Sequence, residues 1–316
     1  MERRKIKNTE LTVSPLVMGG CPLGGHGWGK VERDSLIGAV RTAVEQDINF
    51  FDTSDTYGLG ESERVLGEAL GSSVNDVVIA TKFGVVVGGG RTTYDNSRAH
   101  ATSALEGSLK RLGRDYVDLF LVHYRDGVTP LVELAETMEI LKAQGKIRYA
   151  GLSNVHEGDM AELERLKGHP FVVVQNEYSL ATRRFEAELT TFRDRFGMTP
   201  MTWGSLGQGI LSGKYGRDVS FDATDRRSRA VYENFYGEKL ERNLAIVEYM
   251  RGIAEAHGKS VSAVAIRWIL DYLEGSTVVV GAKRPEQVVQ NAEALGWHLT
   301  DSEVKKLEEI SGGNKL

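Results

Sequence analysis

Four polar residues with complementary chemistry follow apolar stretches of the chain: Asp52, Tyr57, Lys82 and His123. A phenol has a pKa of about 10, so it is a poor acid near neutral pH unless a neighbouring cation stabilises its phenolate. Lys82 could supply that cation, and Asp52 could hold its ammonium and limit the cost of burying it. His123 could donate a hydrogen bond to a substrate oxygen or relay a proton. Together the four predict a site that transfers a proton to or from a substrate oxygen.

Strands and helices must alternate to bring these residues together, and the hydrophobic pattern has this alternation. Short β-branched, apolar segments predict parallel strands covered by helices, and longer segments between them have helical periodicity. The predicted strands span residues 16–19, 49–53, 77–82, 117–123, 147–153, 171–177, 201–205 and 277–282. Helices are predicted over 34–46, 62–70, 101–112 and 131–144, among others.

Eight such units predict an α/β fold, a (β/α)8 TIM barrel, which typically needs about 250 residues plus insertions. We expect residues 1–316 to form one barrel domain, with an N-terminal β-hairpin at 5–13 and two extra helices near the C-terminus, at 285–295 and 301–310. A doubly wound sheet competes with it, but the Gly-x-Gly-x-x-Gly turn after the first strand is absent. In a barrel the strand ends meet at the catalytic face, and the polar stretch 215–241 is expected to loop over it.

Three motifs resemble those of the aldo-keto reductase family, including its bacterial NADP(H)-dependent members. They are NFFDTSDTYG at 49–58, ATK at 80–82 and DLFLVH at 118–123. The resemblance covers nearly the whole chain and implies that Asp52, Tyr57, Lys82 and His123 are catalytic. It further implies that hydride passes from a nicotinamide to a carbonyl carbon while Tyr57 protonates the oxygen, which interconverts an aldehyde or ketone and its alcohol.

The resemblance also implies a cofactor site along the later strands. Side-chain amides match the nicotinamide carboxamide as both donor and acceptor, an aromatic ring can stack on the nicotinamide, and glycines allow close approach to a pyrophosphate. Two basic residues after the last strand could contact a 2'-phosphate, which favours NADP(H) over NAD(H). The expected cofactor residues are Ser153, Asn154, Gln175, Trp203, Ser205, Leu206, Gln208, Gly209, Ser212, Lys214, Gly281, Lys283, Arg284, Gln287, Gln290 and Asn291.

Aromatic and basic residues near the predicted barrel mouth are candidates for the substrate pocket. Trp28 and Tyr124 occupy positions that line the pocket in the family, although the family often has Trp directly after the catalytic His, where Tyr124 stands. Arg125, Arg226 and Arg227 could attract an anionic or polyhydroxylated substrate. The substrate hypothesis is a sugar-derived carbonyl compound or a simple aldehyde, which these residues do not by themselves determine.

Composition limits the kinds of molecule that the protein is expected to bind. A formal net charge of -5 argues against a nucleic-acid or anionic-membrane surface, so we expect a small-molecule partner. A single cysteine excludes an intramolecular disulfide and a multi-cysteine zinc site, and we expect no metal. The charged start at 1–7 is not followed by an apolar segment of signal-peptide length, so a cytoplasmic location is predicted. The oligomeric state is left open.

Two other functions remain open from the sequence. A cofactor-binding sensor or regulatory subunit with the same fold and slow turnover is one, although the intact catalytic set argues against it. A barrel lyase or isomerase with Lys82 as a Schiff-base nucleophile is the other, and it leaves the nicotinamide-type positions unexplained.

Overall fold

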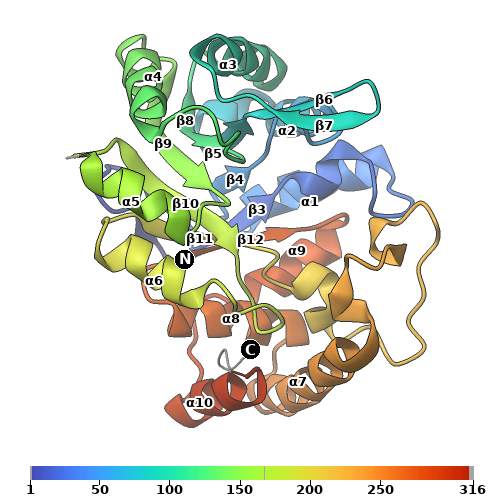
Figure 1. The fold of residues 1–316 in the computed structure, drawn as a ribbon. Helices are drawn as coiled ribbons and strands as arrows, with labels where there is room; N and C mark the ends of the chain where they lie inside the picture. The colour runs from blue at the N-terminus through green and yellow to red at the C-terminus, as the bar shows by residue number, and fades with distance from the viewer. Residues whose placement is uncertain (1, 167, 313–316) are drawn as a thin grey trace.

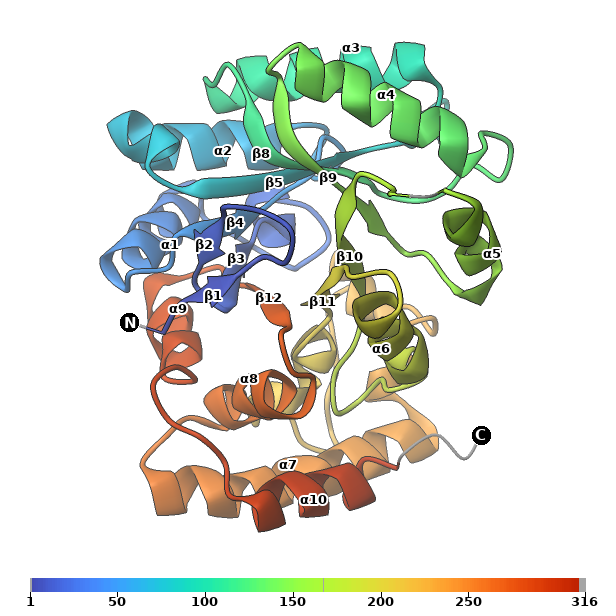
Figure 2. The same ribbon diagram turned by 90° about the vertical axis from the view of Figure 1, so that its left-hand side faces the viewer.

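A closed barrel of eight parallel strands forms the centre of the molecule in the computed structural model, which describes residues 2–166 and 168–312 (Figures 1 and 2). The strands follow one another around the barrel in chain order. They are β3 (Leu16–Gly19), β4 (Phe50–Asp52), β5 (Val78–Phe83), β8 (Val117–Val122), β9 (Ile147–Ser153), β10 (Phe171–Glu177), β11 (Thr199–Trp203) and β12 (Thr277–Gly281). The predicted TIM barrel is therefore confirmed.

Helices cover the outside of the barrel, as Figure 2 shows for α3, α4, α6 and α8. In chain order the helices are α1 (Arg33–Glu45), α2 (Glu61–Leu70), α3 (Arg98–Leu112), α4 (Leu131–Ala143), α5 (Glu157–Arg165), α6 (Glu186–Asp194), α7 (Gly237–His257), α8 (Val261–Tyr272), α9 (Pro285–Ala292) and α10 (Asp301–Ile310). The last two are the helices expected near the C-terminus. Long α7 and α8, between β11 and β12, were not among the helices named from the sequence.

The hydrophobic core has two layers because successive residues of a strand point to opposite faces. One layer, which includes Phe120 and Val174, packs between the strands and the helices. The other fills the barrel, where Leu119 and Val173 pack with Ile6 of the N-terminal hairpin. That hairpin pairs β1 (Arg4–Lys5) with β2 (Thr12–Val13), and its apolar side chains close the barrel at the end opposite the catalytic face.

Two local features differ from the sequence-based boundaries. β11 begins and ends two residues earlier than predicted, and it stops at Gly204, whose φ of 66° is not a strand conformation. The chain after β5 forms an additional hairpin of β6 (Val85–Gly88) and β7 (Arg91–Tyr94), which the sequence did not predict. The polar insertion expected over the mouth holds two 3-10 turns, Arg226–Ser228 and Glu233–Phe235, and its end forms the start of α7.

Within the described residues, no helix combines the length and the apolar character needed to cross a membrane. The cytoplasmic location stays a prediction.

Candidate active site

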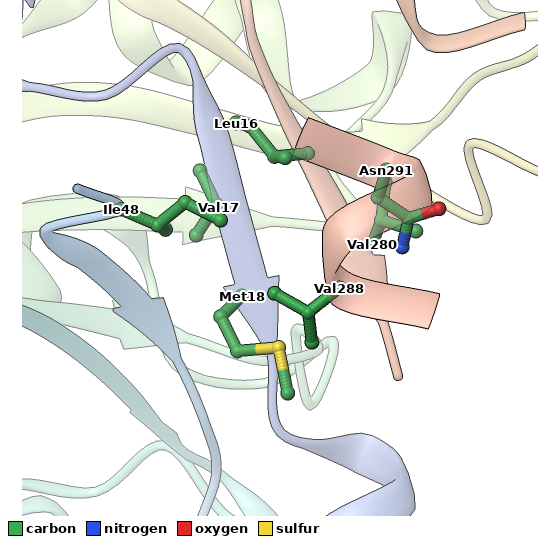
Figure 3. Close-up of a pocket in the computed structure, with 7 residues that line it drawn as sticks. All are labelled: Leu16, Val17, Met18, Ile48, Val280, Val288 and Asn291. Carbon is green, nitrogen blue, oxygen red and sulfur yellow. The ribbon is translucent and has the colours of Figure 1, made fainter. Parts of the chain in front are cut away.

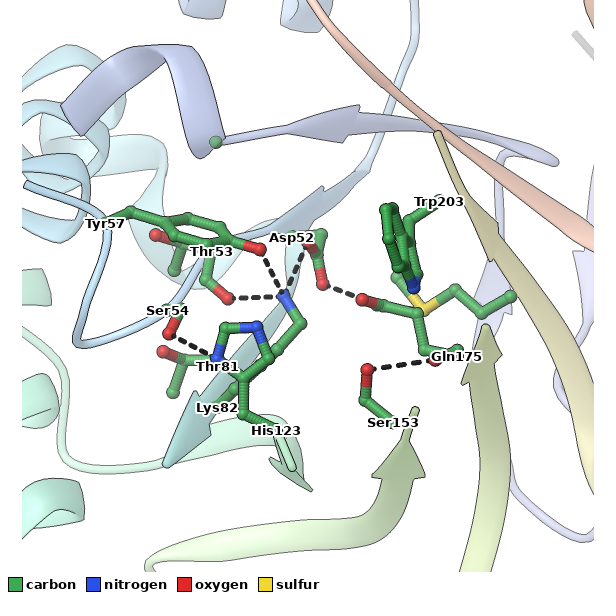
Figure 4. A network of polar contacts seen from close by, with 12 residues as sticks. Asp52, Thr53, Ser54, Tyr57, Thr81, Lys82, His123, Ser153, Gln175 and Trp203 are labelled. Carbon is green, nitrogen blue, oxygen red and sulfur yellow. Dashed lines mark hydrogen bonds and ion pairs between the residues drawn. The ribbon is translucent and has the colours of Figure 1, made fainter. Parts of the chain in front are cut away.

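The four residues singled out by their chemistry meet at one point of the barrel mouth (Figure 4). Lys82, at the end of β5, is fully buried, and its Nζ lies 2.7 Å from Oδ1 of Asp52 at the end of β4. The same ammonium donates to the carbonyl oxygen of Thr53 at 2.8 Å and approaches the Tyr57 hydroxyl at 3.4 Å. The register that pairs β4 with β5 and β5 with β8 brings the three strand ends to the same level.

Both charges of the buried ion pair have further partners. The second carboxylate oxygen of Asp52 accepts a hydrogen bond from Nε2 of Gln175 at 2.8 Å, across the barrel on β10. A buried pair is tolerated only where the remaining lone pairs and protons are satisfied, and this arrangement satisfies them. Lys82 is therefore held as an ammonium beside the Tyr57 hydroxyl.

Tyr57 lies in the loop after β4, with Nζ of Lys82 5.1 Å from the centre of its ring. Burial, reinforced by the negative charge of Asp52, raises the pKa of Tyr57 well above its ordinary value. In the free site, burial and the charge of Asp52 therefore outweigh the stabilisation of the phenolate that the sequence leads us to expect from Lys82. The phenol is therefore protonated near neutral pH and can act as a proton donor.

His123, directly after β8, meets the ring of Tyr57 edge-on with 5.7 Å between ring centres. Burial and the charge of Lys82 lower the pKa of His123 well below its ordinary value. The imidazole is thus neutral at physiological pH, and one nitrogen carries a proton while the other accepts. Its Nδ1 lies 3.2 Å from the hydroxyl oxygen of Ser54.

A cleft of about 1280 Å³ opens above these side chains and extends over the ends of β9 to β12. Every predicted cofactor residue except Asn291 lines it. The amide oxygen of Asn154 accepts a hydrogen bond from Nε1 of Trp203 at 3.1 Å, which fixes the plane of the indole beside the catalytic cluster. Such a cleft has the size and the aromatic and amide lining that a dinucleotide would need.

Asn291 is placed elsewhere. Its side chain borders a small internal cavity between α9 and β3, together with Met18 and Val288 (Figure 3). Successive residues of a helix point about 100° apart, so Gln290 faces the cleft while Asn291 turns toward the barrel. The expectation that Asn291 contacts the cofactor is corrected on this point.

Basic side chains crowd one end of the cleft, which is lined by Lys214, Arg227, Lys283 and Arg284. Burial and the charges of Arg227 and Lys214 lower the pKa of Lys283. Its Nζ donates to the carbonyl oxygen of Trp28 at 2.6 Å. Such mutual repulsion is relieved by an anion, so the donor set fits the phosphates of a nucleotide. We call this group of five residues the basic rim: Lys214, Arg226, Arg227, Lys283 and Arg284.

The insertion after β11 is fastened across the cleft by its own side chains. Arg227 pairs with Asp225 at 2.5 Å and donates to the Tyr215 hydroxyl at 2.6 Å. Asp225 forms an isolated backbone bridge with Trp28, which belongs to the loop after β3. The insertion therefore contacts the far side of the mouth and partly encloses the cleft.

Four of the five predicted substrate-pocket residues line the cleft: Trp28, Tyr124, Arg226 and Arg227. Arg125 is not among the lining residues. Its guanidinium pairs with Asp159 of α5 at 2.8 Å and donates to the carbonyl oxygen of Thr129 at 2.9 Å. Arg125 thus fixes the loop after β8 to α5, and its expected role as a substrate ligand is corrected.

The Aldo/keto reductase family profile matches residues 15–312 of the chain. The chain belongs to this family. Among curated relatives, aldo-keto reductase YhdN of Bacillus subtilis is 31% identical over 98% of this chain and 93% of its own length. As a member of the family, the chain is an oxidoreductase that acts on carbonyl compounds and their alcohols.

Solved structures of relatives show the same architecture. The glycerol dehydrogenase AKR11B4 of Gluconobacter oxydans superposes with a TM-score of 0.88 at 31% identity, covering 98% of this chain and 94% of that one. An aldo/keto reductase of Klebsiella pneumoniae, in complex with NADP and acetate, superposes with a TM-score of 0.77 at 27% identity, covering 100% of this chain and 98% of that one.

Parts of this aldo-keto reductase's cleft could not be found from strand ends alone. The loop after β10 and the approach to α7 contribute residues that no motif had marked: Thr182, Arg184, Val231, Tyr232, Glu233, Asn234, Lys239 and Arg242. Tyr94 of the unpredicted β6–β7 hairpin packs against Tyr124 with 5.6 Å between ring centres. Ser54 lies inside the NFFDTSDTYG motif, but the sequence did not indicate its contact with His123.

Proposed function

We propose that this aldo-keto reductase interconverts an aldehyde or ketone and the corresponding alcohol with NADP(H), and that Tyr57 is the proton donor. The observation that carries the proposal is the position of the Tyr57 hydroxyl, which lies 3.4 Å from the buried Nζ of Lys82, while the imidazole of His123 meets the Tyr57 ring edge-on. A carbonyl oxygen placed between Tyr57 and His123 would meet two hydrogen-bond donors when Nε2 of His123 carries the proton.

The nicotinamide supplies the hydride when bound, and the protein supplies the proton and the positions. Tyr57 gives its proton to the substrate oxygen as negative charge develops there. The phenolate left behind faces the ammonium of Lys82, which stabilises it, and Asp52 keeps that ammonium in place. In alcohol oxidation the same groups act in reverse.

Different residues of the cleft would bind different parts of the cofactor. Asn154 and Gln175 would bind the carboxamide, Trp203 would stack on the nicotinamide ring, and Ser153 and Ser205 support the strand ends on which these residues stand. The glycines at 207 and 209 give the loop after β11 its left-handed turns, with φ of 55° and 106°, so that its backbone can approach the pyrophosphate.

A preference for NADP(H) rests on the basic rim, where Lys283 and Arg284 face the cleft near the start of α9. A 2'-phosphate adds charge that these cations would bind. The preference needs a direct test, because a relative from Escherichia coli, 28% identical over 98% of both chains, is named NADH-specific methylglyoxal reductase.

The substrate pocket combines an aromatic wall with the half-buried guanidinium of Arg226. Trp28 and Tyr124 offer flat surfaces, and the guanidinium of Arg226 lies 5.1 Å from the Trp28 ring centre. This composition suits a small polar carbonyl compound, such as a simple aldehyde or a sugar-derived one.

The test is a turnover assay with a panel of aldehydes, ketones, sugars and alcohols, in which the nicotinamide absorbance is followed with NADPH and with NADH. We expect turnover of at least one carbonyl class, with a higher kcat/KM for NADPH. Tight NADPH binding without turnover of any substrate would contradict the proposal and favour a regulatory role.

A further inference from the structure

A line of hydrogen bonds leads away from the catalytic imidazole on the side opposite the cleft. The hydroxyl oxygen of the buried Ser54 lies 3.2 Å from Nδ1 of His123 and 3.1 Å from Oδ1 of Asp55 (Figure 4 draws the first contact). We propose that Ser54 and Asp55 are positioning residues that set the tautomer of His123. This inference rests on the proposed function, since His123 acts there as a donor to the substrate oxygen.

The Ser54 hydroxyl is the branch point of the line. It also accepts from the backbone N–H of Thr56 at 3.3 Å and lies 3.0 Å from the Thr56 hydroxyl. Ser54 has one hydroxyl proton, so it can give that proton to Asp55 or to His123, but not to both. The state of Asp55 therefore decides what His123 receives.

An ionised Asp55 can only accept, and its charge makes the hydrogen bond from Ser54 the stronger one. The oxygen of Ser54 must then accept from His123, which places the imidazole proton on Nδ1. A neutral Asp55 can instead donate to Ser54, and Ser54 then donates to Nδ1 of His123. The imidazole proton in that case lies on Nε2, because the bond made by one ring nitrogen fixes the state of the other.

The second ring nitrogen of His123 points toward Tyr57 and Lys82 (Figure 4). Among residues 2–166 and 168–312, none forms a hydrogen bond with this Nε2. A carbonyl oxygen needs a donor there, whereas an unprotonated Nε2 would turn a lone pair toward it. The neutral state of Asp55 is therefore the competent one, in both directions of the reaction.

Asp55 lies among charges that make its ionisation sensitive to pH. Glu63 of α2 and Arg111 of α3 face it, and its backbone N–H is bound to the carbonyl oxygen of Lys82 at 3.4 Å. Burial and the charge of Glu63 raise the pKa of Asp55 to about 7, while Arg111 and the Ser54 hydroxyl act in the opposite direction. Asp55 thus changes charge within the physiological range, whereas His123 stays neutral.

The experiment measures kcat for reduction of an aldehyde between pH 5.5 and 9 at saturating NADPH. As pH rises through about 7, Asp55 ionises, and we expect kcat of the unaltered enzyme to fall about 3- to 10-fold to a lower plateau. Asp55→Asn should remove this step and hold the upper plateau, because its amide donates to Ser54 at every pH. Ser54→Ala should remove the step as well, since nothing then connects the carboxylate to the imidazole.

Thr56→Val is the matched control, because it removes a neighbouring hydroxyl that is not between His123 and Asp55. The control should keep the step. A step that persists in Ser54→Ala or in Asp55→Asn, or an unaltered enzyme without a step near pH 7, would overturn the inference. None of these outcomes touches the proposed function, which would fail instead if no carbonyl compound were reduced or if Tyr57→Phe were fully active.

A second readout does not depend on activity. In protein labelled with 15N-histidine, the nitrogen shifts of His123, assigned with a His123→Asn variant, should show the proton on Nε2 below pH 7 and on Nδ1 above it. The same tautomer at pH 5.5 and pH 9 would overturn the inference.

Discussion

The catalytic cluster and the basic rim lie in the same cleft but are built in opposite ways. In the cluster, the ammonium of Lys82 is fully buried and is bound to Asp52 at the end of β4 and to Thr53 and Tyr57 in the loop that follows. In the rim, Lys214, Lys283 and Arg284 stand on loops, and their charges repel one another. The charge of Lys82 is balanced inside the cluster by Asp52, whereas in the rim Asp225 pairs with Arg227 and the neighbouring cations still lower the pKa of Lys283.

This difference predicts different consequences of substitution. The cluster combines chemistry with stability, because removing one partner of a buried pair leaves an uncompensated charge. In the rim, Lys283 is half-buried and Arg284 exposed, so replacing them should weaken the binding of an anionic ligand without leaving a buried charge unpaired. Three predictions test the contrast.

Lys82→Met should have the largest effect. It leaves the Asp52 carboxylate buried without its cation, so we expect a loss of about 3–5 kcal/mol in the free energy of unfolding, together with nearly all turnover. Denaturant unfolding and the aldehyde assay measure the two effects. Combining Lys82→Met with Asp52→Asn should recover much of the stability but none of the activity. If Lys82→Met alone were as stable as the unaltered enzyme, the ion pair of Lys82 and Asp52 would not stabilise the fold.

Lys283→Ala combined with Arg284→Ala should have an intermediate effect confined to binding. We expect the Kd for NADPH to rise about 10- to 100-fold, or about 1.4–2.8 kcal/mol for the two cations together, because solvent screens the half-buried Lys283 and the exposed Arg284. The Kd for NADH should rise much less. Titration of nucleotide fluorescence measures both constants. If the Kd values for NADPH and NADH rose by the same factor, Lys283 and Arg284 would not bind the 2'-phosphate.

Arg125→Ala should have the smallest effect on catalysis. Its largely buried ion pair with Asp159 lies outside the cleft lining, so we expect unchanged KM values and a loss of about 1–3 kcal/mol in stability. Arg226→Ala is the matched comparison, because Arg226 does line the cleft and should raise KM for a polar substrate. A several-fold rise in KM for Arg125→Ala would show that Arg125 does contribute to substrate binding.

The same contrast explains how far the sequence could be interpreted. Positions at strand ends are set by short-range pattern and by the geometry of the barrel, and so Asp52, Lys82 and His123 were placed together before the fold was known. The side-chain direction of Asn291 depends on the rotation of α9, which a pattern fixes only to within a residue or so. The pairing of Arg125 with Asp159 and the β6–β7 hairpin depend on contacts between loops, for which the sequence has no periodic signal.

Electrostatics were the least accessible part. The sequence predicts that Lys82 stabilises the phenolate of Tyr57, but it does not show that burial and the charge of Asp52 outweigh this effect and keep the phenol protonated. The direction of the Tyr57 pKa shift follows from burial, which no list of residue types contains.

The most direct test of the proposed mechanism compares Tyr57→Phe with the unaltered enzyme under saturating NADPH and aldehyde. The substitution removes one oxygen from a side chain that contacts Lys82 at 3.4 Å, so the fold and the cleft should persist. We predict a fall in kcat of about 10²- to 10⁴-fold, the range expected for loss of a general acid, with the Kd for NADPH nearly unchanged. Turnover equal to that of the unaltered enzyme would contradict the assignment of Tyr57 as the proton donor.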